Sequence, residues 1–197
     1  MIKIAKGLKK MKVMIFTSSP NTDGLTAACG NAAKTGAAEA GAQVVMVNLN
    51  QQQISSCHAC DNGWGPCRNE HECQVQDDFQ AIHASMADMD AFVLITPVYW
   101  AEMSESAKAF FDRVRRCEAL KKDKTFIEGK PVIAVAAAGG SGNGLTTCLT
   151  SMERFITHVK AEKFDFIGIT QKSRVYKLDT IQEAAREMVA LLNRKGE

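Results

Sequence analysis

Five short runs of apolar residues, each bounded by turn or polar residues, divide the chain. They have the length and the continuous hydrophobicity of strands that are buried on both faces of a parallel sheet. The predicted strands cover residues 12–17, 43–48, 91–96, 131–138 and 163–169. Between and after them, apolar residues recur at helical spacing. This spacing predicts helices over residues 25–40, 77–86, 104–120, 145–159 and 180–193.

Strands and helices alternate along the chain, which is typical of an α/β fold. Right-handed crossovers place helices on both faces of the sheet, so five such units predict a flavodoxin-like three-layer sandwich. Five strands favour a parallel sheet of order 2-1-3-4-5 over the six-stranded dinucleotide-binding order. In that order, the loops after strands 1 and 3 open a crevice at the carboxyl edge of the sheet, where we expect a ligand to bind.

Length and composition limit the class of protein. We interpret residues 1–197 as a single domain, with an N-terminal extension at 1–10 and a cysteine-containing insertion loop at 49–76. The net charge of +2 is too balanced to favour nucleic-acid binding. No apolar run approaches the roughly 20 residues of a membrane span. Residues 1–10 lack the apolar stretch of a signal peptide, so we expect a soluble, cytoplasmic protein.

The loop after the first strand is rich in hydroxyl groups and runs directly into a helix. Hydroxyls and free backbone N–H groups at a helix N-terminus can hold a phosphate without a cationic side chain. The alternative is an ordinary turn and helix cap, which Ser, Thr, Asn and Asp form in most proteins. The loop contains neither the nucleotide-binding P-loop sequence nor the glycine fingerprint of dinucleotide-binding proteins. We therefore predict a phosphate-bearing ligand of another kind.

Two further loops offer a surface for a flat ring. The third strand leads into Pro97, Val98, Tyr99 and Trp100, and a glycine cluster at 139–144 follows the fourth strand. An apolar wall with backbone N–H groups along its edge suits a conjugated ring, and glycine lets the backbone approach closely. Alternatively, the two aromatic residues cap the core or line an interface between subunits.

Taken with residues 18–21, Gly24, Thr26, Ser104 and the 108–113 segment, these loops resemble the NADPH-dependent FMN reductase family of the flavodoxin superfamily. The resemblance implies FMN as cofactor and NAD(P)H as co-substrate. It places the phosphate at Ser18, Ser19, Asn21, Gly24, Leu25 and Thr26, the isoalloxazine ring against Pro97, Val98, Tyr99 and Trp100, and Gly139 and Gly140 at the border of the ring. We interpret Ser104 and Arg113 as scaffold residues, and we assign no catalytic residue.

Four of the seven cysteines gather in one segment, at Cys57, Cys60, Cys67 and Cys73. Thiolates at this C-x2-C-x6-C-x5-C spacing can converge on an iron-sulfur cluster or on zinc, or they can serve as free thiols or a redox disulfide. The segment resembles the cysteine motif of iron-sulfur flavoproteins, and this resemblance implies a [4Fe-4S] cluster. The gap between the second and third cysteines is longer here than in that motif. The other cysteines, Cys29, Cys117 and Cys148, lie within predicted helices and are expected to be buried.

The function predicted from these features is an FMN-dependent oxidoreductase. In this prediction, NAD(P)H delivers hydride to FMN, which passes electrons to a flavin, a quinone or another small acceptor. The alternative is an iron-sulfur flavoprotein or a flavodoxin-like carrier that moves electrons between protein partners. The family resemblance also implies a homodimer or homotetramer.

Overall fold

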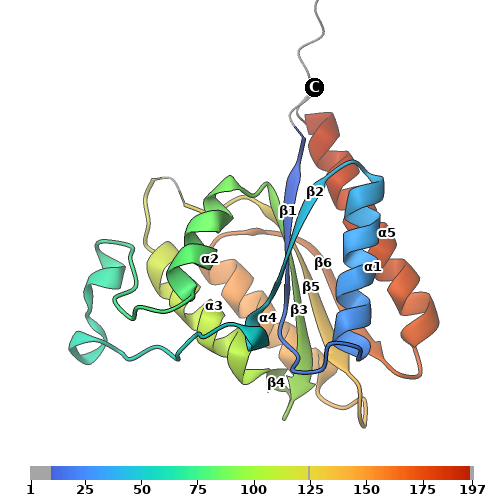
Figure 1. The fold of residues 1–197 in the computed structure, drawn as a ribbon, viewed down its shortest axis with the longest axis horizontal. Helices are drawn as coiled ribbons and strands as arrows, with labels where there is room; N and C mark the ends of the chain where they lie inside the picture. Colours follow the sequence, from blue (N-terminus) through green and yellow to red (C-terminus); the bar gives the residue numbers. More distant parts are fainter. Residues whose placement is uncertain (1–9, 124, 196–197) are drawn as a thin grey trace, which may run out of the picture.

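The computed structural model describes residues 10–123 and 125–195 (Figure 1). Most of the predicted extension at 1–10 therefore lies outside the described residues. The strands are β1 (Lys12–Thr17), β2 (Gln43–Asn48), β3 (Ala91–Tyr99), β4 (Glu102–Met103), β5 (Pro131–Ala138) and β6 (Glu162–Thr170). The helices are α1 (Leu25–Glu39), α2 (Phe79–Ser85), α3 (Glu105–Glu118), α4 (Leu145–His158) and α5 (Arg174–Lys195). In the described part of the chain, no helix has the length and apolar character that crossing a bilayer requires.

The predicted flavodoxin-like α/β fold is observed, but the prediction of a five-stranded sheet was wrong. The sheet has six strands: five are parallel, in the order β2-β1-β3-β5-β6, and β4 pairs with β3 off this path. The pairing of β4 with β3 is antiparallel and aligns Val98 with Met103 and Tyr99 with Glu102. The prediction missed β4 because two residues are too few to show a strand periodicity.

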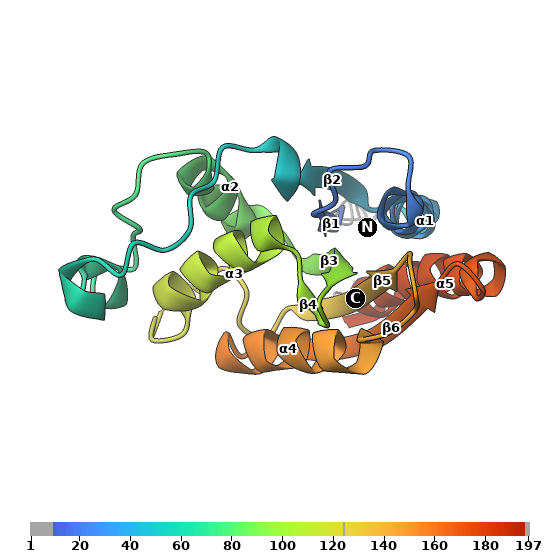
Figure 2. The ribbon, with the colours of Figure 1, turned by 90° about the horizontal axis from the view of Figure 1, so that it is seen from below.

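Helices cover both faces of the sheet, with α1 and α5 on one face and α2, α3 and α4 on the other (Figure 2). Alternate residues of each strand point to opposite faces, so the strands contribute to two cores. Val13 and Ile15 of β1 join the core beneath α1 and α5. Met14 and Phe16 of the same strand join the core beneath α2, α3 and α4. The central strands are therefore buried on both sides, as their continuous apolar sequence requires.

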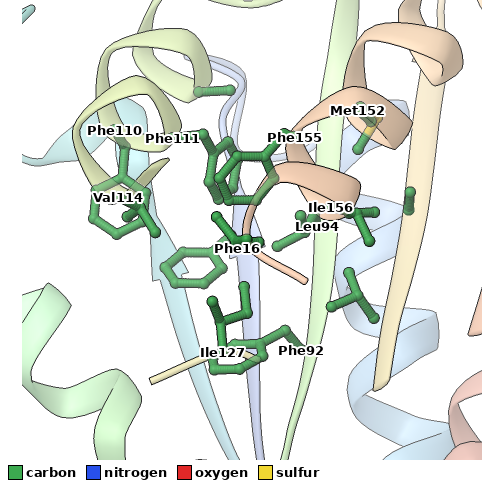
Figure 3. Close-up of a cluster of buried hydrophobic side chains, with 14 of the residues drawn as sticks. Phe16, Phe92, Leu94, Phe110, Phe111, Val114, Ile127, Met152, Phe155 and Ile156 are labelled. Atoms are coloured by element: carbon green, nitrogen blue, oxygen red, sulfur yellow. The ribbon is translucent and has the colours of Figure 1, made fainter. Parts of the chain in front are cut away.

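Aromatic packing fixes α3 against the end of β1. The ring of Phe16 lies 5.1 Å from that of Phe110 and 5.7 Å from that of Phe111, measured between centroids, and Phe111 lies 4.8 Å from Phe155 of α4. Figure 3 shows Phe110 and Phe111 facing Phe16 inside this core. Such ring pairs contribute about 0.5–1.5 kcal/mol each beyond their buried area. They hold the start of α3 beside the loop that follows β1.

The segment between β2 and α2 extends away from the sheet, beside α2 and α3 (Figures 1 and 2). It contains three single-turn 3-10 helices, Leu49–Gln51, Asp61–Gly63 and Pro66–Arg68. Arg116 of α3 donates from Nη2 to the Gly63 carbonyl at 2.6 Å, which ties the segment to the body of the protein. This segment corresponds to the predicted insertion loop at 49–76; the single-domain organisation stays a prediction.

Candidate functional site

The loops that follow β1, β3 and β5 lie together at one edge of the sheet, the lower edge in Figure 1. These loops carry the residues that the sequence singled out for a cofactor. Because all three strands are parallel, their carboxyl ends meet at this edge. The fold thus brings the hydroxyl-rich loop, the aromatic residues and the glycine cluster to one side of the molecule.

The loop after β1 is held from behind by hydrogen bonds to its backbone. The Ser18 carbonyl accepts from the hydroxyls of Ser104 at 3.0 Å and Ser106 at 3.2 Å, and the Ser19 carbonyl accepts from the Asn48 amide at 3.3 Å. The hydroxyl of Ser18 is buried and donates to the Ile95 carbonyl. Ser18 therefore braces the loop with its side chain and its carbonyl.

The loop leads into the N-terminus of α1, which is suited to an anion. The N-cap residue is Gly24, which has no side chain to occupy the free N–H groups, and no acidic residue stands in the first turn. The first N–H groups of a helix have no partner within it, and its dipole favours negative charge there. The Thr26 side chain is almost completely buried beside them.

A pocket of about 160 Å³ adjoins this helix start. The residues that line it are Thr17, Ser19, Asn21, Thr22, Thr26, Ala27, Asn31, Met46 and Asn48. Ser19, Asn21 and Thr26 were predicted from the sequence, whereas Asn48 was missed. Its position at the carboxyl end of β2 was a signal that the sequence already offered. Hydroxyls, side-chain amides and free N–H groups are the donors that a phosphate ester requires, so the residues fit the phosphate of FMN.

The aromatic residues form the tip of a hairpin rather than a loop. Strand β3 was predicted to end at residue 96 but continues through Pro97 and Val98 to Tyr99. Trp100 and Ala101 then make a two-residue turn into β4, with φ of +49° and +65°. Positive φ at two residues other than glycine or asparagine stores backbone strain, which is common at ligand sites. The turn leaves the Trp100 side chain fully exposed.

The glycine cluster lies against this hairpin. A side chain at Gly144 would come within 2.6 Å of the Ala101 Cα atom, so only glycine permits this approach. Gly139 and Gly140 are exposed, and a side chain at Gly140 would meet no atom within 4 Å. The exposed Trp100 and the open glycine backbone are thus carried on segments that touch each other.

The four clustered cysteines, Cys57, Cys60, Cys67 and Cys73, line one small cavity of about 20 Å³, together with Arg113 and Arg116 of α3. Within the described residues, no group of three His, Cys, Asp or Glu side chains is arranged to hold a metal ion. The donor set is nevertheless one that soft metal centres require, and one arginine nitrogen in the cavity lacks a partner. The four thiols therefore fit an iron-sulfur cluster in their chemistry.

The remaining cysteines, Cys29, Cys117 and Cys148, are buried in helices, as predicted. Burial raises the pKa of each of these thiols to about 12. They are small core residues and take no part in the cavity's thiol lining.

An ion pair anchors the cysteine segment to α3. Arg113 is 1% exposed, and its Nη1 donates to the Asp77 carboxylate at 2.7 Å. Burial alone would raise the pKa of Asp77, but hydrogen bonds from Arg113 and from the N–H groups of Ser55 and Phe79 outweigh it, so this pKa lies below its usual value. The interpretation of Arg113 as an ion-paired scaffold residue agrees with this arrangement.

A doubly wound parallel sheet with a hydroxyl-rich, uncapped helix start at its carboxyl edge is the architecture of flavodoxin-like α/β proteins. The chain belongs to the NADPH-dependent FMN reductase family, whose sequence model matches residues 11–162. The resemblance predicted from the loop motifs is confirmed, and the protein is a flavoprotein oxidoreductase.

Known relatives agree with this assignment. The chain is 30% identical over 134 residues to an iron-sulfur flavoprotein from Methanosarcina thermophila. The aligned region covers 68% of this chain and 66% of that protein. An iron-sulfur flavoprotein from Methanocaldococcus jannaschii is 26% identical over 145 residues, covering 74% and 71%. The solved structure of an NAD(P)H:quinone oxidoreductase from Methanothermobacter marburgensis has a TM-score of 0.71 at 18% identity, covering 91% of this chain and 96% of that one. This last likeness shows the shared fold.

The Asp77–Arg113 pair gives a pH-dependent prediction. Replacing Asp77 with Asn leaves a buried guanidinium without its counter-charge, which should lower the free energy of unfolding by about 3 kcal/mol at pH 7. The pair's contribution is present above the unfolded pKa of about 3.9 and is lost as the pH falls through the lower folded pKa. The deficit of Asp77→Asn should therefore shrink between pH 7 and about pH 2, as measured by urea unfolding.

Asp112→Asn is the control for this experiment, because Asp112 pairs with Lys108 at the surface of α3, the helix that also carries Arg113. Surface pairs contribute about 0–1 kcal/mol, so this variant should change stability little at either pH. An Asp77→Asn deficit that is the same at both pH values would contradict the assignment of the pair.

Proposed function

We propose that the protein binds FMN with its phosphate at the start of α1 and catalyses the transfer of reducing equivalents from NAD(P)H to a small acceptor, such as a flavin or a quinone. The observation that carries the proposal is the uncapped α1 N-terminus beside buried hydroxyls and a 160 Å³ pocket. Ser19, Asn21 and Thr26 hold the phosphate with their side chains, while Ser18, Gly24 and Leu25 contribute backbone N–H groups.

The ring lies between the hairpin and the glycine loop in this proposal. Pro97, Val98 and Tyr99 supply an apolar wall, and Trp100 is exposed at the tip, where it can cover one face of the ring. Gly139 and Gly140 present backbone groups to the edge of the ring. Bound FMN supplies the hydride chemistry, and the protein orients the ring and leaves one face open to the nicotinamide. This division of roles needs no acid, base or nucleophile from the chain.

A second candidate function is that of an iron-sulfur flavoprotein that carries electrons between protein partners. Two observations favour it: the four cysteines line one cavity with two arginines, and relatives at 26–30% identity bear the name iron-sulfur flavoprotein. In this proposal, Cys57, Cys60, Cys67 and Cys73 ligate a [4Fe-4S] cluster. The family resemblance also supports a homodimer or homotetramer in the cytoplasm, which stays a proposal.

The phosphate assignment predicts the effect of two substitutions. Ser19→Ala and Thr26→Ala each remove a hydroxyl beside the start of α1, and a hydrogen bond to a charged group contributes about 1.5 kcal/mol or more. Each variant should therefore bind FMN about tenfold more weakly in a fluorescence titration. Thr35→Ala is the matched control, because Thr35 lies exposed later on α1 and its hydroxyl donates to the Asn31 carbonyl of the same helix. Unchanged FMN affinity in both test variants would refute the assignment.

Steady-state kinetics separates the two candidate functions. With FMN bound, the enzyme should oxidise NADPH or NADH continuously when menadione or ferricyanide is added. Ser19→Ala should show a lower rate of oxidation at FMN concentrations that do not saturate the protein. A protein that retains FMN but shows negligible turnover with either nucleotide would exclude the reductase function and favour the electron carrier.

A further inference from the structure

Two arginine side chains of α3 line the cysteine cavity. Arg113 and Arg116 are three residues apart and so share one face of the helix. The Nε atom of Arg113 lies 3.2 Å from the Sγ atom of Cys73. The other nitrogens of Arg113 are engaged by Asp77 and by the carbonyls of Ser55 and Val75. Arg113 is thus locked in place with one N–H directed at a cysteine sulfur.

Arg116 has one donor that the rest of the protein does not use. Across the described residues, its Nε atom is the one buried side-chain nitrogen or oxygen that lacks a hydrogen-bond partner. Its Nη2 is fixed on the Gly63 carbonyl, so the guanidinium is held beside the cavity. A buried N–H without an acceptor costs about 1–3 kcal/mol. The four cysteines line the same cavity as Arg116, so a sulfur of a bound cluster is the acceptor that this N–H could gain.

We propose that Arg116 and Arg113 donate N–H hydrogen bonds to the cluster-ligating sulfurs of Cys67 and Cys73, and thereby raise the reduction potential of the iron-sulfur cluster. The inference rests on the second candidate function. Adding an electron makes a thiolate-ligated cluster more negative. Hydrogen bonds and positive charge at the sulfurs stabilise that reduced form more than the oxidised form. The two arginines are therefore potential-setting residues rather than ligands.

Arg116 is the residue to test, because Arg113 is fully buried and its replacement would also break the Asp77 pair. Arg116→Gln removes the charge and the Nε donor, and Arg116→Lys keeps the charge but removes the Nε donor. Arg115→Gln is the matched control. Arg115 is the neighbouring residue on α3 and loses the same charge, but it lines the groove between α3 and α4 with Phe111 and Phe155.

The experiment uses the full chain, reconstituted anaerobically with ferrous iron and sulfide and titrated potentiometrically with EPR detection. Iron and sulfide per chain are measured for each variant, and the FMN potential in the same titration is the internal reference. Arg116→Gln should shift the one-electron reduction equilibrium of the cluster about tenfold toward the oxidised form, which is about 59 mV. In Arg116→Lys, the cluster equilibrium should be shifted in the same direction. In Arg115→Gln, the cluster equilibrium should stay within about twofold of the wild type, and so should the FMN reduction equilibrium in every variant, which is well below the tenfold shift.

Two results would overturn the inference, and they differ in whether they also refute the presence of the cluster. An unchanged cluster potential in Arg116→Gln, at wild-type iron and sulfide content, would refute the role of Arg116 and leave the cluster in place. A wild-type protein that takes up zinc alone, or no metal at all, would remove both the cluster and the role of Arg116. The FMN-dependent function would then still be judged by flavin binding and turnover.

Discussion

The hydrogen bonds from Ser104 and Ser106 to the Ser18 carbonyl are the interaction on which the arrangement of the site depends. A buried carbonyl without a donor would destabilise the loop by about 1–3 kcal/mol, so the loop is held where these hydroxyls reach it. Packing of Phe16 against Phe110 and Phe111 brings the two segments to that distance. The loop is thereby fixed from behind, and its outer N–H groups and the start of α1 remain available to an anion.

Helix α3 connects this loop to the cysteine cavity. Its N-cap, Ser104, braces the candidate phosphate loop, and Arg113 and Arg116 line the cavity nine and twelve residues later. At 1.5 Å per residue, these positions are about 14 and 18 Å from the helix start. One rigid element thus sets the relative position of the two candidate redox sites. The phenylalanines that anchor α3 in the core lie between its two functional ends.

Much of the fold could be predicted from the sequence, because buried parallel strands and amphipathic helices leave clear periodicities. The clustering of the loops after β1, β3 and β5 also followed, since parallel strands share a carboxyl edge. Strand β4 could not be predicted from the sequence, because two residues are too few to show a periodicity. The positive φ at Trp100 could not be predicted either. The pairing of Ser104 with Ser18 spans 86 positions, and the unpartnered nitrogen of Arg116 depends on packing. Such long-range contacts leave no local signal in one sequence.

We propose that backbone N–H groups and hydroxyls, rather than cationic side chains, bind the phosphate of the flavin. The most direct measurement compares the affinities of the flavin-free protein for FMN and for riboflavin, which lacks the phosphate, by fluorescence titration. Two or more charge-assisted hydrogen bonds should make FMN bind about 100-fold more tightly. Equal affinities for the two flavins would mean that the protein does not bind the phosphate.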